Sequence, residues 1–143
     1  MHHSTFLNQL ISEGKVKVKE DNPFASQKIT YHDSCYLGRG NEVYEAPREV
    51  IATLKADIKE MKRSRSQGMC CGAGGAQMFK EEEPGTQRVS SLRTEHALET
   101  GAEIIASACP FCMTMMTDGV KSKDKQQSVK VYDIAELIAQ GVN

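Results

Sequence analysis

The chain has 143 residues, a formal net charge of −1 and 39% hydrophobic residues, a composition that fits one folded domain with a core of its own. A charge this close to zero gives no reason to expect a nucleic-acid partner. No apolar run approaches the roughly 18 residues that span a membrane, and the N-terminus lacks the pattern of a signal peptide. These features predict a single domain over residues 1–143 without a membrane span.

The first third of the chain predicts one helix and one strand. A helix over residues 4–13 is expected because Ser4 is a suitable N-cap, Gly14 is a suitable stop and the apolar residues between them recur at helical spacing. Residues 15–27 are weakly patterned and predict a connection, with room for a short edge strand. Residues 28–32 predict a strand with Ile29 and Tyr31 on one face, and this strand leads toward the first cysteine.

The middle of the chain predicts a turn, a helix and a weak strand. Gly38 and Gly40 mark the turn, and Pro47 fits the first position of the helix that follows. Apolar residues at helical spacing extend that helix to about residue 61, namely Val50, Ile51, Leu54, Ile58 and Met61. A short strand over residues 65–69 would then lead into the glycine-rich segment. Few of these residues favour a strand, so the composition argues against it.

The last third of the chain alternates clearly between helices and strands. Residues 86–100 predict a helix, and residues 103–108 form a continuous apolar run that is typical of a buried parallel strand. Pro110 then opens a second helix, and residues 129–132 predict the last strand. Asp133 begins a capping box for the final helix.

This alternation of strands and helices predicts an α/β fold with a small parallel sheet of three to four strands flanked by helices. The carboxyl ends of parallel strands share one edge of the sheet, and open α/β sheets bind ligands at that edge. The cysteines follow predicted strands, so we expect them to converge at the carboxyl ends of the strands from distant parts of the sequence.

Five cysteines are the feature that points to chemistry. They form the pattern C-x34-C-C-x37-C-x2-C, made of Cys35, Cys70, Cys71, Cys109 and Cys112. An odd number of clustered cysteines favours metal or redox chemistry in a reducing compartment over a disulfide framework, so we expect a cytoplasmic location. Two adjacent cysteines are awkward ligands for one small ion. They suit a larger polynuclear site, where neighbouring sulfurs can reach different metal atoms.

A glycine-rich turn follows the adjacent cysteines directly. Gly72, Gly74 and Gly75 have no Cβ atom, so their backbone can come close to a bound group and point N–H donors at it. We therefore include these three glycines in the candidate binding site.

Two other kinds of site remain open from the residues alone. A structural zinc ion would use four ligands and leave one cysteine over. A thioredoxin-like dithiol at Cys109 and Cys112 would leave the other three cysteines unexplained. His32 and His96 are expected to be packing or surface residues and not ligands.

Three segments resemble the CCG cysteine-rich domain found in heterodisulfide reductase and in the iron–sulfur subunits of glycolate, glycerol-3-phosphate and lactate oxidation systems. They are residues 31–39 (YHDSCYLGR), 70–75 (CCGAGG) and 108–112 (ACPFC). The resemblance spans about residues 28–120, and Ser34 stands where proline is common. These families usually carry two such motifs together with ferredoxin-type clusters, whereas this chain carries one motif.

In heterodisulfide reductase-like proteins the motif holds a non-cubane 4Fe-4S cluster, with all five cysteines as ligands and one of them bridging. The resemblance therefore implies a 4Fe-4S cluster on the five cysteines of this chain, with the cubane and the non-cubane kind both open. The cluster would either reduce a disulfide itself or pass electrons to other domains or subunits, such as a flavoprotein, a ferredoxin-type iron–sulfur subunit or a quinone-linked subunit. The chain would then be a C-terminal CCG domain from a larger oxidoreductase, inactive alone, with any membrane association supplied by its partners. We expect protein purified in air to lack the cluster.

Overall fold

The sheet of this computed structural model has four short parallel strands in the order β2-β1-β3-β4, and the structure describes all residues from 1 to 143. In chain order the strands are β1 (Lys28–Tyr31), β2 (Asp57–Ile58), β3 (Ile104–Ser107) and β4 (Lys130–Asp133). β1 pairs with β2 on one side and with β3 on the other, and β3 also pairs with β4. The predicted α/β fold with a small parallel sheet is confirmed.

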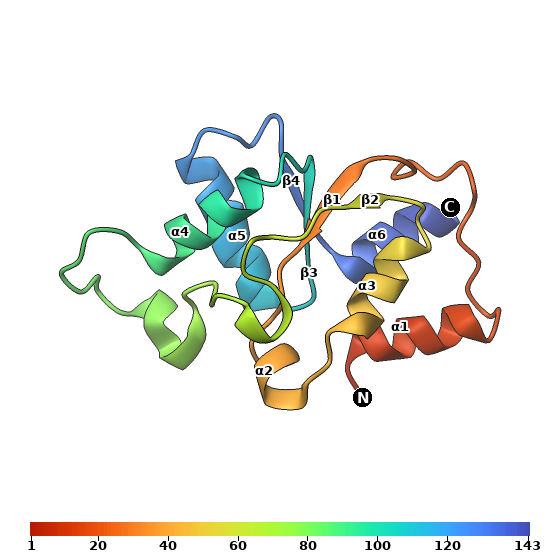
Figure 1. The fold of residues 1–143 in the computed structure, drawn as a ribbon, viewed down its shortest axis with the longest axis horizontal. Helices are drawn as coiled ribbons and strands as arrows, with labels where there is room; N and C mark the ends of the chain where they lie inside the picture. The colour runs from red at the N-terminus through yellow and green to blue at the C-terminus, as the bar shows by residue number, and fades with distance from the viewer.

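Helices cover both faces of the sheet (Figure 1). One layer contains α1 (His3–Ser12), α3 (Glu45–Ala52) and α6 (Ile134–Val142), and the other contains α4 (Val89–Leu98) and α5 (Pro110–Ser122). Successive side chains of β3 pack into the two layers in turn, because side chains alternate across a strand. Ile104 shares a core cluster with Leu137 of α6, whereas Ile105 shares another with Met116 of α5.

The strand order places a topological switch between β1 and β3. From β1 the chain passes through α3 to β2, and from β3 it passes through α5 to β4 on the opposite side. The connections that leave the carboxyl ends of β1 and β3 therefore diverge and leave a crevice between them, which is where open α/β sheets bind ligands. Cys35 and Cys109 follow these two strands.

The helix predicted from Pro47 to Met61 is shorter than expected. It corresponds to α3, which ends at Ala52. Lys55 then adopts a left-handed backbone with a φ of 55°, and the short strand β2 follows. Leu54 and Met61 are both buried, but they lie in different core clusters. Their helical spacing therefore arises from two separate packing environments and not from one helix face.

The strand predicted over residues 65–69 is absent. Residues Arg65–Gln67 form a 3-10 helix, η1, and η2 (Gly74–Phe79) consists of short 3-10 turns interrupted by a kink at Gly75 and Ala76. A one-turn helix, α2 (Gly38–Asn41), stands where the sequence predicts a glycine turn. No strand therefore leads directly into Cys70, and this cysteine must be positioned by other means.

Two helix starts also differ from the prediction. His2 caps α1 in place of Ser4, since its side chain accepts a hydrogen bond from the N–H of Ser4. α4 begins at Val89, later than expected, while the predicted capping box at Asp133 is present at the start of α6. None of the helices is both long enough and apolar enough to cross a membrane.

Gly119 determines how closely α4 and α5 approach. A Cβ atom added there would overlap the hydroxyl of Thr94 in α4. We expect Gly119→Ala to lower the free energy of unfolding by about 1–3 kcal/mol in urea denaturation, because the helices must move apart. Lys121→Ala, on the exposed side of α5, is the control and should change little. Thr94→Ala should restore part of the loss in the double variant, and purely additive losses would contradict the contact.

Candidate metal centre

Two loops reach the crevice from neighbouring strands. His32 and Cys35 lie in the loop after β1, and Cys109 lies between β3 and α5. The backbone N–H of His32 donates to the carbonyl oxygen of Ala106 at 2.9 Å, which continues the pairing of the two strands. Cys112 follows in the first turn of α5. These cysteines therefore follow the carboxyl ends of neighbouring strands at one edge of the sheet, as the sequence predicts.

The third loop, which carries Cys70, is held by side chains and not by a strand. Asp33 accepts a hydrogen bond from the backbone N–H of Arg65 at 2.7 Å. Nη1 of Arg93 donates to the carbonyl oxygen of Arg63, also at 2.7 Å. Both anchors lie shortly before the adjacent cysteines in the chain, so they fix where this loop enters the crevice.

Asp33 is the anion of a buried ion pair with Arg48. Both carboxylate oxygens accept hydrogen bonds from the guanidinium at 2.8 Å, and Arg48 also donates to Glu60 at 2.6 Å. Burial alone would raise the pKa of Asp33, but the hydrogen bonds from Arg48 and from the N–H of Arg65 outweigh it and hold the pKa below its ordinary value. The ionised carboxylate therefore ties α3 to the loop that carries Cys70.

All five cysteines are free thiols, and two of them are buried. Cys71 and Cys112 have only 3% of their surface exposed. One ligand atom from each of Cys71, Cys112 and His32 lies within 4.8 Å of the other two. Cys109 packs against the buried pair. The partly exposed cysteines are Cys35, Cys70 and Cys109, of which the first two lie outside this tight group.

The two buried cysteines are hydrogen-bonded to each other, and this contact shifts their pKa values in opposite directions. A hydrogen bond from Cys112 lowers the pKa of Cys71 to about 4, against the effect of burial, and His32 and the backbone N–H of Ala73 act in the same direction. The same contact and burial raise the pKa of Cys112. These contacts favour the thiolate form of Cys71 over its thiol, and the thiolate is the species that binds a metal.

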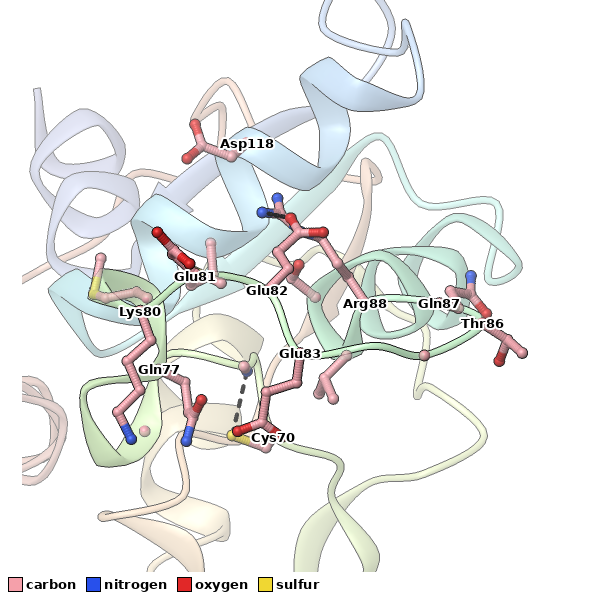
Figure 2. Close-up of a pocket in the computed structure, with 17 residues that line it drawn as sticks. Cys70, Gln77, Lys80, Glu81, Glu82, Glu83, Thr86, Gln87, Arg88 and Asp118 are labelled. Atoms are coloured by element: carbon pink, nitrogen blue, oxygen red, sulfur yellow. Dashed lines mark hydrogen bonds and ion pairs between the residues drawn. The ribbon is translucent and has the colours of Figure 1, made fainter.

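The glycine turn contributes a hydrogen bond to a sulfur. The N–H of Gly72 donates to Sγ of Cys70 at 3.3 Å (Figure 2). Gly72 has a φ of 94°, a backbone conformation that other residues rarely adopt. Gly74 and Gly75 belong to η2, and a Cβ atom added at Gly74 would lie 3.9 Å from the same sulfur. The turn therefore passes its backbone close to the site, as the sequence predicts.

A hollow of about 660 Å³ opens beside Cys70 (Figure 2). Only four of its 17 lining residues are hydrophobic, so it is not a typical apolar ligand pocket. Arg88 is paired with Glu82. Carboxylates predominate over cations among the charged groups of the lining, which are Lys80, Glu81, Glu82, Glu83, Arg88 and Asp118. The hollow therefore presents a negatively charged wall.

His32 and Arg93 belong to the site although the sequence does not predict them as part of it. Nε of Arg93 donates to Nδ1 of His32 at 2.9 Å, and both side chains are almost completely buried. Nε2 of His32 and Nη2 of Arg93 have no hydrogen-bond partner. The available sequence signal for His32 is its position at the carboxyl end of a strand, just before Cys35. No local pattern identifies Arg93.

These features fit a thiolate-ligated metal centre. A buried N–H without an acceptor and a buried guanidinium without an anion are both unfavourable, and the sulfurs of such a centre would supply acceptor and negative charge together. Cys71 and Cys112 already provide a buried pair of sulfurs next to His32. The fold and the site together define an α/β domain with a cysteine-rich centre at the switch point of its sheet.

Comparison with known sequences agrees with this description. Residues 29–117 match the CCG family, which is described as a cysteine-rich domain. The chain belongs to this family, and the resemblance seen in the three cysteine segments is confirmed.

Three relatives illustrate where such domains occur. The chain is 47% identical to the probable iron-sulfur-binding oxidoreductase FadF of Bacillus subtilis and 41% identical to the EtfAB:quinone oxidoreductase of Syntrophomonas wolfei. It is 39% identical to a subunit of the dihydromethanophenazine:CoB–CoM heterodisulfide reductase of Methanosarcina barkeri. These matches cover 99%, 96% and 99% of this chain. The chain spans only 20%, 20% and 34% of the length of these relatives.

Asp33→Asn tests the anchor of the third loop. The change removes the charge that holds Arg48, so we expect the free energy of unfolding of the metal-free protein at neutral pH to fall by about 3 kcal/mol. The folded pKa of Asp33 lies below its unfolded value, so its stabilisation is present above the unfolded pKa and is lost as the pH falls through the folded pKa. The difference between variant and wild type in urea denaturation should therefore shrink at acid pH.

The control for this experiment is Asp57→Asn, which removes an exposed ion pair with Lys59. An exposed pair contributes at most about 1 kcal/mol. A loss in Asp33→Asn no larger than the loss in Asp57→Asn would contradict the role of Asp33 as an anchor.

Proposed function

We propose that this chain is an electron-transfer domain that holds one 4Fe-4S cluster on its five cysteines. The observation that carries the proposal is the buried pair of Cys71 and Cys112, with a third cysteine packed against it, at the switch point of the sheet. Five thiolates exceed the four ligands of a zinc ion and suit a polynuclear cluster. The proposed ligands are Cys35, Cys70, Cys71, Cys109 and Cys112, with the backbone of Gly72, Gly74 and Gly75 beside them.

The residues of the chain supply the surroundings that such a cluster needs. When bound, the cluster supplies one-electron redox chemistry. Burial of Cys71 and Cys112 keeps water from one side of the site. The N–H of Gly72 donates to the sulfur of Cys70, and hydrogen bonds of this kind raise the reduction potential. The partly exposed cysteines leave the other side open for electron exchange.

The relatives support a role inside a larger protein. Their names describe an iron-sulfur-binding oxidoreductase, a quinone oxidoreductase and a subunit of a heterodisulfide reductase. We infer that residues 1–143 form one domain that exchanges electrons with further domains or with a flavoprotein, ferredoxin-type or quinone-linked subunit, and that does not turn over alone. The proposed location is the cytoplasm, with any contact to a membrane made through those partners.

Reduction of a disulfide at the cluster is a second candidate function, because the hollow beside Cys70 has room for a small substrate. That reaction consumes two electrons and two protons and releases two thiols. The acidic lining, with Glu81, Glu82, Glu83 and Asp118, repels substrates that carry carboxylates or phosphates. Electron transfer requires no such pocket, so we prefer it.

Anaerobic reconstitution with iron and sulfide should give a brown protein with about four irons per chain, because five convergent thiolates suit a cluster. Metal analysis and the visible spectrum measure the result. Reconstitution without sulfide is the control, since a cluster requires sulfide and a single ion does not. One zinc per chain without iron uptake would overturn the proposal and favour a zinc ion at His32, Cys71 and Cys112.

Cys70→Ser and Cys71→Ser should each abolish cluster assembly and leave the helical circular dichroism of the apo protein close to that of wild type. Buried aliphatic side chains such as Leu54 and Leu137 contribute about 1.5–3 kcal/mol each, and they form a core that needs no metal. Iron content and thermal unfolding of the apo proteins are the measurements.

Thr114→Ala serves as the control for the cysteine variants, because Thr114 is exposed in α5 and is not a proposed ligand. It should assemble the cluster normally. Loss of cooperative unfolding in apo Cys70→Ser or apo Cys71→Ser, compared with apo wild type, would assign these cysteines to the core instead.

A further inference from the structure

We propose that Arg93 and His32 form a positioning pair that raises the reduction potential of the metal centre. Arg93 fixes the orientation and the proton of His32, His32 presents an N–H to the buried sulfur of Cys71, and Arg93 adds a buried positive charge. The proposal rests on the proposed cluster-binding function. Neither residue acts as a ligand in it.

The contact between Arg93 and His32 determines which ring nitrogen carries the proton. A guanidinium can only donate hydrogen bonds, and Nε of Arg93 lies 2.9 Å from Nδ1 of His32. Nδ1 must therefore accept. A protonated ring would place two buried cations in contact, so the imidazole is neutral and carries its single proton on Nε2.

The proton on Nε2 of His32 has no partner in the metal-free protein. The sulfur of Cys71 is an acceptor within reach, since a ligand atom of His32 lies within 4.8 Å of it, as it does of the sulfur of Cys112. A hydrogen bond to a negatively charged sulfur is stronger than one to a neutral thiol. Such a bond stabilises the more negative, reduced state of an iron–sulfur centre.

The same geometry argues against His32 as a metal ligand. An imidazole binds a metal through a free lone pair on one of its nitrogens. In His32 the lone pair of Nδ1 is engaged by Arg93, and Nε2 carries the proton. The short separation between His32, Cys71 and Cys112 therefore describes a contact to the ligands and not a third ligand.

Arg93 carries a buried charge and forms no direct ion pair with a carboxylate. Its Nε donates to His32, its Nη1 donates to the carbonyl oxygen of Arg63, and its Nη2 has no partner. Arg48, by contrast, is paired with Asp33. A buried cation without an anion is unfavourable, so the thiolates of the site are its available counter-charge. Each electron added to the centre is attracted by this charge, which favours reduction.

Reduction potentials of reconstituted variants test the pair. His32→Leu removes the donor and His32→Gln keeps an N–H in the same region, while Arg93→Met removes the charge and Arg93→Lys keeps it. Potentiometric titration followed by electron paramagnetic resonance gives the midpoint potential. We expect His32→Leu and Arg93→Met each to shift it negative by about 59 mV, which is a tenfold change for a one-electron couple. His32→Gln and Arg93→Lys should shift it less.

His96→Leu is the matched control. His96 is buried in the same helix as Arg93, and the charged groups around it are Lys62, Arg63, Arg93 and Glu99, without a cysteine among them. Loss of this buried histidine should leave the midpoint potential unchanged.

A second measurement does not require the cluster. Long-range proton–nitrogen correlation spectra of the apo protein identify the tautomer of each histidine. We expect His32 in the wild type to carry its proton on Nε2, and we expect Arg93→Met to lose this single tautomer because methionine cannot donate. A proton on Nδ1, or on both nitrogens, in the wild type would overturn the proposal.

Two further results would also overturn it. One is a midpoint potential in His32→Leu and Arg93→Met equal to that of His96→Leu. The other is loss of iron from both His32 variants with normal uptake by His96→Leu, because His32 would then be a ligand. If the wild type binds no iron, the cluster-binding function fails and the effect on potential fails with it, while the tautomer still decides whether Arg93 positions His32.

Discussion

The parallel pairing of β1 with β3 is the constraint on which the site depends. The register that places Tyr31 beside Ala106 brings the loops after both strands to the same point on the edge of the sheet. The two crossovers then leave in opposite directions, so neither helix fills the space between those loops. If β3 lay at the far side of β2, that strand would separate the loops that carry Cys35 and Cys109. Helix α5 adds to this arrangement. It begins at the residue after Cys109 and carries Cys112 in its first turn.

The two buried arginines differ in the groups that compensate their charge. Arg48 is matched by Asp33 and Glu60, and the resulting network fastens backbone segments that have no regular hydrogen-bond pattern. Arg93 reaches only neutral acceptors, His32 and the carbonyl of Arg63. Arg93 forms no direct ion pair with a carboxylate and burial lowers its pKa, so thiolates at the site would provide a counter-charge close to the guanidinium. Natural proteins concentrate such local conflicts at functional sites.

Sequence patterns predicted the parts of the fold that depend on residues close together in the sequence. The apolar run of β3, Pro110 at the start of α5 and the capping box at Asp133 are local signals, and the three elements lie where these signals place them. The cysteine spacing indicated the candidate site because few residue types bind metals. The failures depend on contacts between distant residues. The left-handed backbone at Lys55 breaks an apparently continuous helix, and the bond between Arg93 and His32 joins residues 61 positions apart.

The five cysteines are buried to different degrees, so one side of the site is closer to solvent than the other. Cys71 and Cys112 face the interior, while Cys35 and Cys109 are partly open to solvent and precede the exposed rings of Tyr36 and Phe111. Electron tunnelling slows steeply with distance. For the proposed function, a partner that approaches along the carboxyl edge of the sheet would therefore exchange electrons fastest. A partner that rests on either helical layer would be separated from the site by the width of a helix, about 10 Å. For the proposed function, the carboxyl edge of the sheet is therefore the short path to the cluster.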